Sequence, residues 1–447
     1  MKKQQNILLL MLLGLTFVYF IASFQKQSQG PLAHREPGRY LELGKTNIAP
    51  NAKTQNESSV VFNDPAISSK WDLQKTDAEK AWQVSQGSRH IVVAIIDTGC
   101  DVRHEDLSNN IWQNPGEIGN DSEGRNKATN GIDDDGNGFI DDLYGWNFVN
   151  NNNDLTDNHG HGTHIAGIVG AEGGNGKGII GIAPKVSMMI LKYYDPKTPT
   201  DNLRNTVQAI HYATKMRANI INYSGGGLEF SEEEKKAIQE AQRRGILFVA
   251  AAGNERSNSD HHKYFPADYG LSNIISVTAI DPNTQVLPSS NYGVETVQIA
   301  APGQNILSTL PRNTYGFMTG TSQATAFVTG AAAVVMAHKG TFSVDETKKY
   351  LLATGDGEET LINKTGTSRK LNLYKALTVL DSGIGATGVQ AANITADAPV
   401  FSHESEMFNS EERGKRNPAK LGESASGMSG FGKSLLEAVQ KKPSNQK

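Results

Sequence analysis

The stretch HIVVAIIDTG, residues 90–99, decides the fold. Its six consecutive apolar residues, 91–96, leave no polar face, and the run stops at the carboxylate of Asp97. A strand that is apolar on both faces is typical of the centre of a parallel sheet covered by helices on each side. Similar β-rich apolar runs recur along the chain, at residues 186–192, 218–224, 245–253 and 274–280.

Helical patterns separate these runs. Residues 200–217 and 231–245 have the spacing of amphipathic helices, and the second begins at Ser231, has an acidic first turn and stops at Gly245. Ser at the start and Gly at the end are the usual helix boundaries. Strands that alternate with helices predict an α/β domain with a mainly parallel sheet.

Composition limits the class of protein. The 447 residues include 43 basic and 47 acidic side chains, a balance that does not suggest a nucleic-acid partner. Cys100 is the only cysteine, so an intramolecular disulfide is excluded. We therefore expect core packing or bound metal ions to stabilise the fold.

Four segments are predicted along the chain. Residues 1–24 are a signal peptide or N-terminal membrane anchor, because a basic start precedes an apolar run over 7–24. Residues 25–60 are a polar linker or short pro-segment, 61–380 are the α/β domain, and 381–447 are a polar, mostly disordered tail. Cleavage of the apolar run and its retention in a membrane both remain open, and either places the domain outside the cytoplasm.

Three short motifs carry reactive side chains. Asp97 ends the first strand, HGHGTHIAGIVG (159–170) begins a helix, and GTSQATAFVTGAAAVVMA (320–337) places Ser322 at the start of a long apolar helix. The carboxyl ends of parallel strands are the usual place for such groups. A serine hydroxyl at a helix start lies beside free N–H groups and the positive end of the helix dipole.

The order Asp97, His161, Ser322 resembles that of the subtilisin family, the subtilases. The segments SGGG, AAGNE, SNYG and IAAPG lie between His161 and Ser322 in the family's order, and the resemblance covers about residues 63–380. It implies a three-layer α/β fold, with a central mainly parallel sheet flanked by helices, and a serine endopeptidase that needs no catalytic cofactor. Together with the N-terminal segment 1–24, this predicts an exported peptidase. Protein or peptide substrates are the implied partners.

The resemblance also implies a role for each matching residue. His161 would be the general base for Ser322, Asp97 would orient its imidazole, and Asn254 of AAGNE would donate to the oxyanion. Ser224, Gly226 and Gly227 of SGGG would lie beside an extended substrate, an arrangement that favours broad specificity. The nucleophile motif departs from the common G-T-S-M-A-x-P, and the altered positions are Gln323, Thr325, Ala326 and Phe327.

The three histidines of HGHGTH allow another interpretation. His159, His161 and His164 could form a zinc site, but neither an H-E-x-x-H motif nor a carboxylate partner in the helix accompanies them. We expect His164 to pack inside and His159 to lie on the rim. A metallohydrolase is thus the weakest hypothesis, and a catalytically weak fold that acts as a calcium-stabilised binding module is the main alternative to the peptidase.

A second motif predicts a structural calcium ion. NGIDDDGNGFIDD, residues 130–142, matches the first eight positions of an EF-hand loop, but Tyr144 occupies the twelfth position in place of Glu. The expected ligands are Asp133, Asp135 and Asn137, and either Asp141 or Asp142 would complete the shell. A solvated acidic surface loop is the alternative, although so many carboxylates in one turn would repel one another without a cation.

Overall fold

The computed structural model describes residues 62–379, and the predicted leader, linker and tail lie outside them. A nine-stranded sheet in the order β10-β11-β7-β6-β5-β4-β1-β3-β2 forms the centre. From β7 to β2 all neighbours are parallel, and only the β10–β11 pair is antiparallel. The strands are β1 (Gly87–Asp97), β2 (Gly145–Asn147), β3 (Lys185–Lys192), β4 (Ile220–Tyr223), β5 (Leu247–Ala251), β6 (Ile274–Ile280), β7 (Ile299–Pro302), β10 (Asp356–Gly357) and β11 (Arg369–Lys370).

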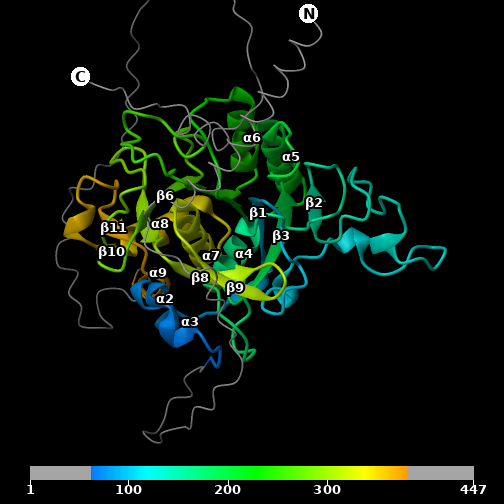
Figure 1. Ribbon diagram of the computed structural model, residues 1–447, viewed down its shortest axis with the longest axis horizontal. Coiled ribbons are helices and arrows are strands. Elements are labelled where there is room, and N and C mark those ends of the chain that lie inside the picture. Colours follow the sequence, from blue (N-terminus) through cyan, green and yellow to red (C-terminus); the bar gives the residue numbers. More distant parts are fainter. Residues whose placement is uncertain (1–61, 380–447) are drawn as a thin grey trace, which may run out of the picture. The chain divides into compact units, whose positions relative to one another are not determined.

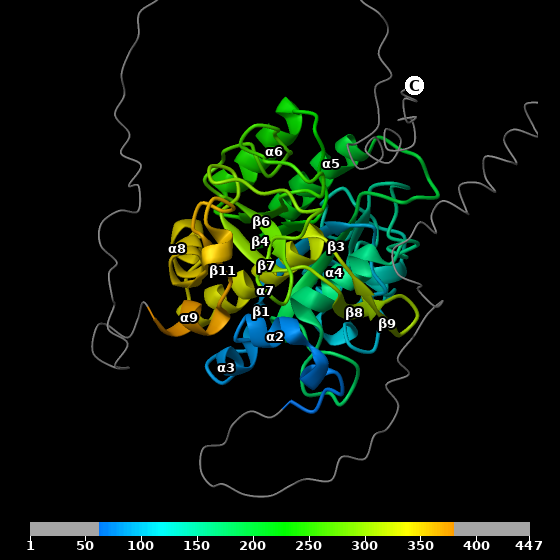
Figure 2. The same ribbon diagram turned by 60° about the vertical axis from the view of Figure 1, so that its left-hand side comes forward.

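Helices cover both faces of this sheet (Figures 1 and 2). On one face α5 (Asn202–Lys215) and α6 (Glu232–Arg243) pack against residues such as Ala94 and Ile96 of β1. On the other face the alternate residues Val93 and Ile95 join a larger apolar core. The helices on that side are α2 (Trp71–Lys75), α3 (Ala78–Trp82), α4 (His161–Gly170), α7 (Thr321–Lys339), α8 (Val344–Thr354) and α9 (Leu373–Thr378). The predicted three-layer α/β fold is therefore confirmed.

Helix α7 is buried on all sides over most of its length. Its residues from Thr321 to Met336 are all buried, and the helix packs against β1, β4, β5, β6, β7 and α4. A helix that is apolar all round is expected in the interior of a large domain. Because α7 begins at the carboxyl ends of these strands, it brings Ser322 to the same edge of the sheet as Asp97.

The four departures from the common nucleophile motif leave α7 unbroken. Gln323, Thr325, Ala326 and Phe327 lie in its first two turns, and none is more than 2% exposed. The hydroxyl of Thr325 donates to the carbonyl of Thr321 at 2.8 Å. The altered residues therefore belong to the packing of the helix start.

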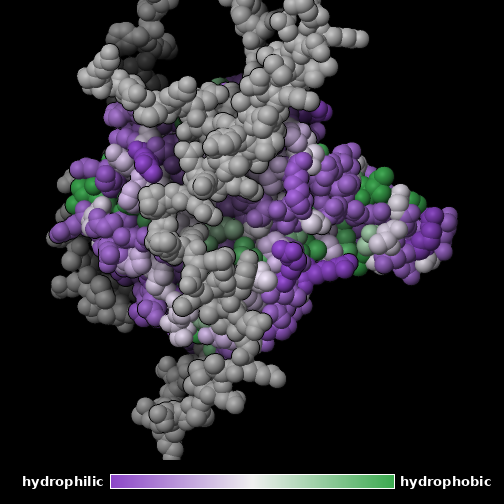
Figure 3. Space-filling model, in the orientation of Figure 1, coloured by the Kyte–Doolittle hydropathy of each residue, from purple (hydrophilic) through white to green (hydrophobic). Residues whose placement is uncertain are grey.

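A small two-stranded antiparallel sheet completes the domain. It consists of β8 (Ile306–Leu310) and β9 (Thr314–Met318) and packs against α4. Between β1 and β2 lies a long loop with three short 3-10 helices, η2 (Ser108–Asn110), η3 (Pro115–Glu117) and η4 (Lys127–Thr129). Its distal part projects at the right of Figure 1, and Figure 3 shows that its surface is mainly hydrophilic with isolated apolar patches. Among residues 62–379 no helix combines the length and apolar character needed to cross a membrane.

Candidate active site

Asp97 and His161 form a direct hydrogen bond. Asp97 is the last residue of β1 and is 3% exposed, and its Oδ1 lies 2.7 Å from Nδ1 of His161, the first residue of α4. The same oxygen accepts a hydrogen bond from the Thr98 N–H at 2.8 Å. Two donors on one buried carboxylate oxygen fix its orientation and compensate for the loss of water.

The pKa of His161 is raised from its ordinary value of 6.5. Burial, the largest single influence, opposes the charge on the imidazole, but the charge and hydrogen bond of Asp97, together with the charge of Asp157, outweigh it. This is the environment expected for a base that must hold a proton transiently. His164, one turn further on, is fully buried, and burial together with the charge of His161 lowers its pKa to about 3.

The other two histidines take the predicted places. His164 lies 3.0 Å, through Nε2, from the carbonyl oxygen of Ile306 and 3.2 Å from that of Gly316, so it packs between α4 and the small sheet. His159 is exposed and lines the same pocket as His161. The three rings do not converge on a common point, and the metallohydrolase hypothesis has no support in this geometry.

Ser322 is linked to the segment that follows β4. Its Oγ donates to the carbonyl oxygen of Ser224 at 2.9 Å, and the Ser224 hydroxyl donates to the carbonyl oxygen of Ser322 at 3.2 Å. Ser224 and Gly225 line a pocket together with Asp97, Thr98, His161 and His159, and Tyr193 and Tyr194 complete its wall. The structure therefore joins Asp97 and His161 directly and links Ser322 to their pocket through Ser224.

Asn254 holds its amide in a defined direction. Its Oδ1 accepts hydrogen bonds from the N–H of Thr321 at 3.1 Å and from the Thr321 hydroxyl at 3.3 Å. Because the oxygen is bound to Thr321, the Nδ2 group is left to donate elsewhere. Within the described part of the chain Nδ2 has no hydrogen-bond partner, and Asn254 is exposed.

One residue of the predicted substrate strip, Gly227, already pairs with another segment of the protein. Gly227 exchanges both backbone hydrogen bonds with Phe265, at 2.8 and 2.7 Å. Gly226 has a φ of 153°, and a Cβ there would lie 2.5 Å from the carbonyl oxygen of Phe265. Glycine is required at 226 for both reasons. Among residues 62–379 neither Gly226 nor Ser224 has a backbone–backbone hydrogen bond, although the Ser224 carbonyl accepts from the Ser322 hydroxyl.

The acidic loop forms a cluster that differs from the predicted ligand set. Ligand oxygens of Glu117, Asp133 and Asp135 all lie within 4.8 Å of one another. Asp141 lies outside this group, and its carboxylate accepts from the N–H of Gly131 at 3.0 and 3.2 Å. The side-chain oxygen of Asn137 accepts from the Phe139 N–H at 2.8 Å, so it too is occupied.

Glu117 is the member that sequence reasoning missed. It is 0% exposed, its Oε1 accepts from the Asp134 N–H at 3.0 Å, and its buried Oε2 has no hydrogen-bond partner. Burial raises its pKa to about 7, and the carboxylates of Asp142, Asp134 and Asp135 add to this. A buried carboxylate oxygen without a donor is costly, so this group calls for a cation or a proton.

An α/β protein with an Asp–His pair beside a serine at a helix start has the arrangement of a serine hydrolase. The chain belongs to the subtilase family, whose characteristic sequence matches residues 88–373. It is similar to thermitase of Thermoactinomyces vulgaris, with 33% identity over 70% of this chain and 98% of that protein.

Two further relatives show the same similarity. The major intracellular serine protease of Bacillus subtilis is 34% identical over 59% of this chain and 73% of its own length. Subtilisin-like protease 1 of Plasmodium berghei is 33% identical over 70% of this chain and 53% of its own length. This chain therefore spans about half of that Plasmodium relative.

Proposed function

We propose that the protein is an exported serine endopeptidase that hydrolyses peptide bonds through an acyl-enzyme on Ser322. The observation that carries the proposal is the 2.7 Å bond between Asp97 and His161 at a pocket shared with Ser224, to which Ser322 is bonded in both directions. Two relatives are named as proteases, one of them as a serine protease, and these names support the same reaction class.

Each residue would act at a stated atom. Nε2 of His161 takes the proton as Oγ of Ser322 attacks the substrate carbonyl, while Asp97 keeps the other ring nitrogen protonated. The carbonyl oxygen gains negative charge and accepts hydrogen bonds from Nδ2 of Asn254 and from the Ser322 N–H. Collapse of this intermediate expels the amine, to which His161 returns the proton. Water then takes the place of the amine and attacks the ester as His161 removes its proton. The proton returns to Oγ of Ser322 as the carboxylic acid leaves.

The substrate would lie extended beside the strip that follows β4. Gly226 has a free backbone edge and Gly227 does not, so pairing with substrate is centred on Ser224 and Gly226. Recognition through the substrate backbone supports proteins and peptides as the substrate class and a broad side-chain preference.

Export is proposed from the sequence of residues 1–24 alone. One relative is named as an intracellular protease, so membership of the family does not fix the compartment. A basic start followed by the apolar run 7–24 favours secretion or attachment to the cell envelope.

A structural calcium ion is the cation proposed for the acidic cluster. Glu117, Asp133 and Asp135 supply the hard oxygen ligands that calcium prefers. The unpartnered Oε2 of Glu117 is the observation in favour of a bound ion over a merely solvated loop. An ion there would join η3 to the loop at 133–135 and stabilise the folded state.

Covalent labelling of Ser322 tests the proposed reaction. The full chain, its Ser322→Ala variant and the control Ser108→Ala, at an exposed position in η2, are treated with a fluorophosphonate probe and assayed on unfolded casein. We expect labelling of the peptide that contains Ser322, and cleavage by the wild type and the control only. A folded wild-type protein that neither labels nor cuts would refute the peptidase and leave the binding module.

A further inference from the structure

The loop before α4 contains a buried carboxylate that acyl transfer does not use. Asp157 is 6% exposed. Its Oδ1 accepts from the Thr98 hydroxyl at 2.8 Å, from the His159 N–H at 3.0 Å and from the Gly160 N–H at 2.7 Å. Its Oδ2 accepts from the N–H and the hydroxyl of Thr163, at 2.9 and 2.7 Å. Five donors thus satisfy a charge that would otherwise be costly to bury.

Through these hydrogen bonds the side chain of Asp157 caps the first turn of α4. The N-cap residue is Gly160, which has a φ of 92° and no side chain to bind the free N–H groups of the first turn. Asp157 supplies the missing acceptor for Gly160 and Thr163, and its negative charge interacts favourably with the helix dipole. The place where α4 begins, and hence the backbone of His161, depends on this carboxylate.

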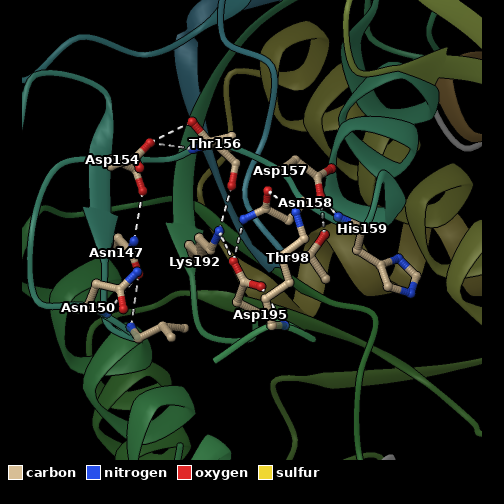
Figure 4. Close-up of polar contacts among 12 residues, drawn as sticks. Thr98, Asn147, Asn150, Asp154, Thr156, Asp157, Asn158, His159, Lys192 and Asp195 are labelled. Carbon is tan, nitrogen blue, oxygen red and sulfur yellow. Dashed lines mark hydrogen bonds and ion pairs between the residues drawn. The ribbon is translucent and has the colours of Figure 1, made fainter. Parts of the chain in front are cut away.

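Thr98 connects the same carboxylate to β1. Its hydroxyl donates to Asp157 and accepts from the N–H of Gly162 at 2.9 Å, while its own N–H donates to Asp97. Figure 4 shows the Thr98 hydroxyl and the Asp157 carboxylate facing each other, with His159 beside them. The Thr98 hydroxyl and the Asp157 carboxylate therefore link the residue that follows Asp97 to Gly160 and Gly162, the two residues that flank His161.

A second anchor holds the outer side of this loop. The side-chain amide of Asn158 donates to Asp195 at 2.7 Å, and the buried ammonium of Lys192 donates to Asp195 at 2.8 Å (Figure 4). Lys192 also donates to the carbonyl oxygen of Thr156. The loop is thus tied to the end of β3 on one side and to the Asp97 segment on the other, which leaves Asp157 little freedom to move.

We propose that Asp157 is a positioning residue that holds His161 against Asp97, through Thr98 and the first turn of α4, and places a second negative charge near the imidazole. The inference rests on the proposed peptidase function for its kinetic consequences only. The hydrogen bonds of Asp157 and Thr98 around His161, called the clamp below, do not depend on whether the protein cleaves a substrate.

The charges around His161 also support a positioning role for Asp157. Burial disfavours the imidazolium of His161, while Asp97 and, as a smaller influence, Asp157 favour it, and the net result is a raised pKa. The other ionisable groups around the ring are His159, His164 of α4, and Tyr193 and Tyr194 after β3. Asp97 and Asp157 are the two carboxylates that contribute to this pKa, so neutralising either should lower it.

The test compares Asp157→Asn, Thr98→Val and Thr98→Ser with the wild type. Asp154→Asn is the matched control, because the carboxylate of this exposed aspartate in the same loop accepts only from the N–H and hydroxyl of Thr156 among residues 62–379. Two quantities are measured in the full chain: the pH profile of kcat/KM on a peptide, and the pKa of His161 by NMR of ¹³Cε1-labelled histidine, assigned with a His161→Gln variant.

For Asp157→Asn we expect a lower pKa of His161, a matching shift of the acid limb to lower pH, and a fall in kcat of about 10- to 100-fold with little change in KM. Thr98→Val should show a smaller effect of the same sign. Thr98→Ser, which keeps the hydroxyl, should restore wild-type values, and Asp154→Asn should not differ from the wild type.

A wild-type His161 pKa in folded Asp157→Asn, with only a lower melting temperature, would reduce Asp157 to a structural cap and overturn the proposal. If Asp157→Asn does not fold, Thr98→Val against Thr98→Ser decides by the same criteria. If the wild type has no peptidase activity, the proposed function fails while the NMR titration still tests the clamp.

Discussion

The hydroxyl of Ser322 donates its hydrogen bond to the carbonyl oxygen of Ser224, 2.9 Å away. The proposed nucleophile is therefore held by the strip beside which substrate would lie. Before attack, the hydroxyl hydrogen must turn from this carbonyl toward His161. Such hydrogen bonds often become well aligned only when substrate is bound, and one neutral hydrogen bond of about 1 kcal/mol is a small barrier to that change.

Asn254→Ala should slow the chemistry without weakening substrate binding. The variant loses the amide that Thr321 orients, and with it a donor to the oxyanion. Loss of such a donor costs about 3 kcal/mol, a magnitude measured in subtilisin itself, so kcat should fall by about 100-fold or more with KM nearly unchanged. Steady-state kinetics beside Asn283→Ala, an exposed control, provide the measurement. An unchanged kcat would remove Asn254 from the mechanism.

Glu117→Gln should have opposite effects with and without calcium. In EGTA the variant should be as stable as the wild type or more stable, because it removes a buried carboxylate with an unpartnered oxygen. With calcium at about 100 times its dissociation constant, the wild type should gain about 2.7 kcal/mol and the variant much less.

Thermal unfolding of Glu117→Gln and of the exposed control Glu123→Gln, each with 1 mM calcium and with EGTA, provides the comparison. Equal stabilisation of both variants by calcium would place the ion elsewhere.

Glu234→Gln should change the pH dependence of stability. Burial raises the pKa of Glu234 from 4.5 to about 7, although the Tyr269 hydroxyl, 2.7 Å away, partly opposes this. The unfolded chain loses this proton near pH 4.5 and the folded chain near pH 7, so the carboxyl destabilises the fold increasingly between these values. Above pH 7 the Gln variant should be more stable by roughly 3 kcal/mol.

Urea unfolding at pH 4 and pH 8 measures this difference. The exposed neighbour Glu233→Gln is the control, because it shares the first turn of α6. A Glu234→Gln variant that gains no stability at pH 8 relative to pH 4 would contradict the assigned pKa.

Gly162→Ala should separate α4 from β1. A Cβ at this position would lie 2.1 Å from the carbonyl oxygen of Gly99 and 3.1 Å from Cβ of Asp97, so the helix start must move. Because His161 precedes Gly162, kcat should fall by about 10-fold or more, together with a lower melting temperature. Gly357→Ala, whose added Cβ would meet nothing closer than 3.9 Å, should change neither quantity. A fully active Gly162→Ala would show that the His161–Asp97 contact tolerates this displacement.

The sequence predicted the parts of the fold that carry strong local signals. The expected strands at 90–97 and 274–280 correspond to β1 and β6, and the expected helix at 231–245 is α6, with Ser231 as its cap. Strand β11, with two residues, and β2, with three, were not predicted, because segments so short have no recognisable alternation. Their pairing is determined by neighbouring strands and not by their own sequence.

The residues of the candidate site likewise divide into those with a strong local sequence signal and those without one. Asp97, His161 and Ser322 are adjacent to long strands or helices, so their positions could be predicted. Glu117 could not, because it joins Asp133 and Asp135 only after the loop between β1 and β2 has folded. Asp157 had a weak signal, a carboxylate four residues before the histidine that begins a helix, but its role depends on Thr98, which lies 59 residues earlier in the chain.

The position of α7 late in the chain has a consequence for biosynthesis. Asp97, His161 and Asn254 leave the ribosome before Ser322, and translation at about 5–20 residues per second separates the first of them from the serine by roughly ten seconds or more. A nascent chain that ends at β7 has the proposed base and oxyanion donor but lacks Ser322, the proposed nucleophile. The cell that makes this protein is therefore not exposed to the proposed peptide-bond cleavage until synthesis of the domain is almost complete.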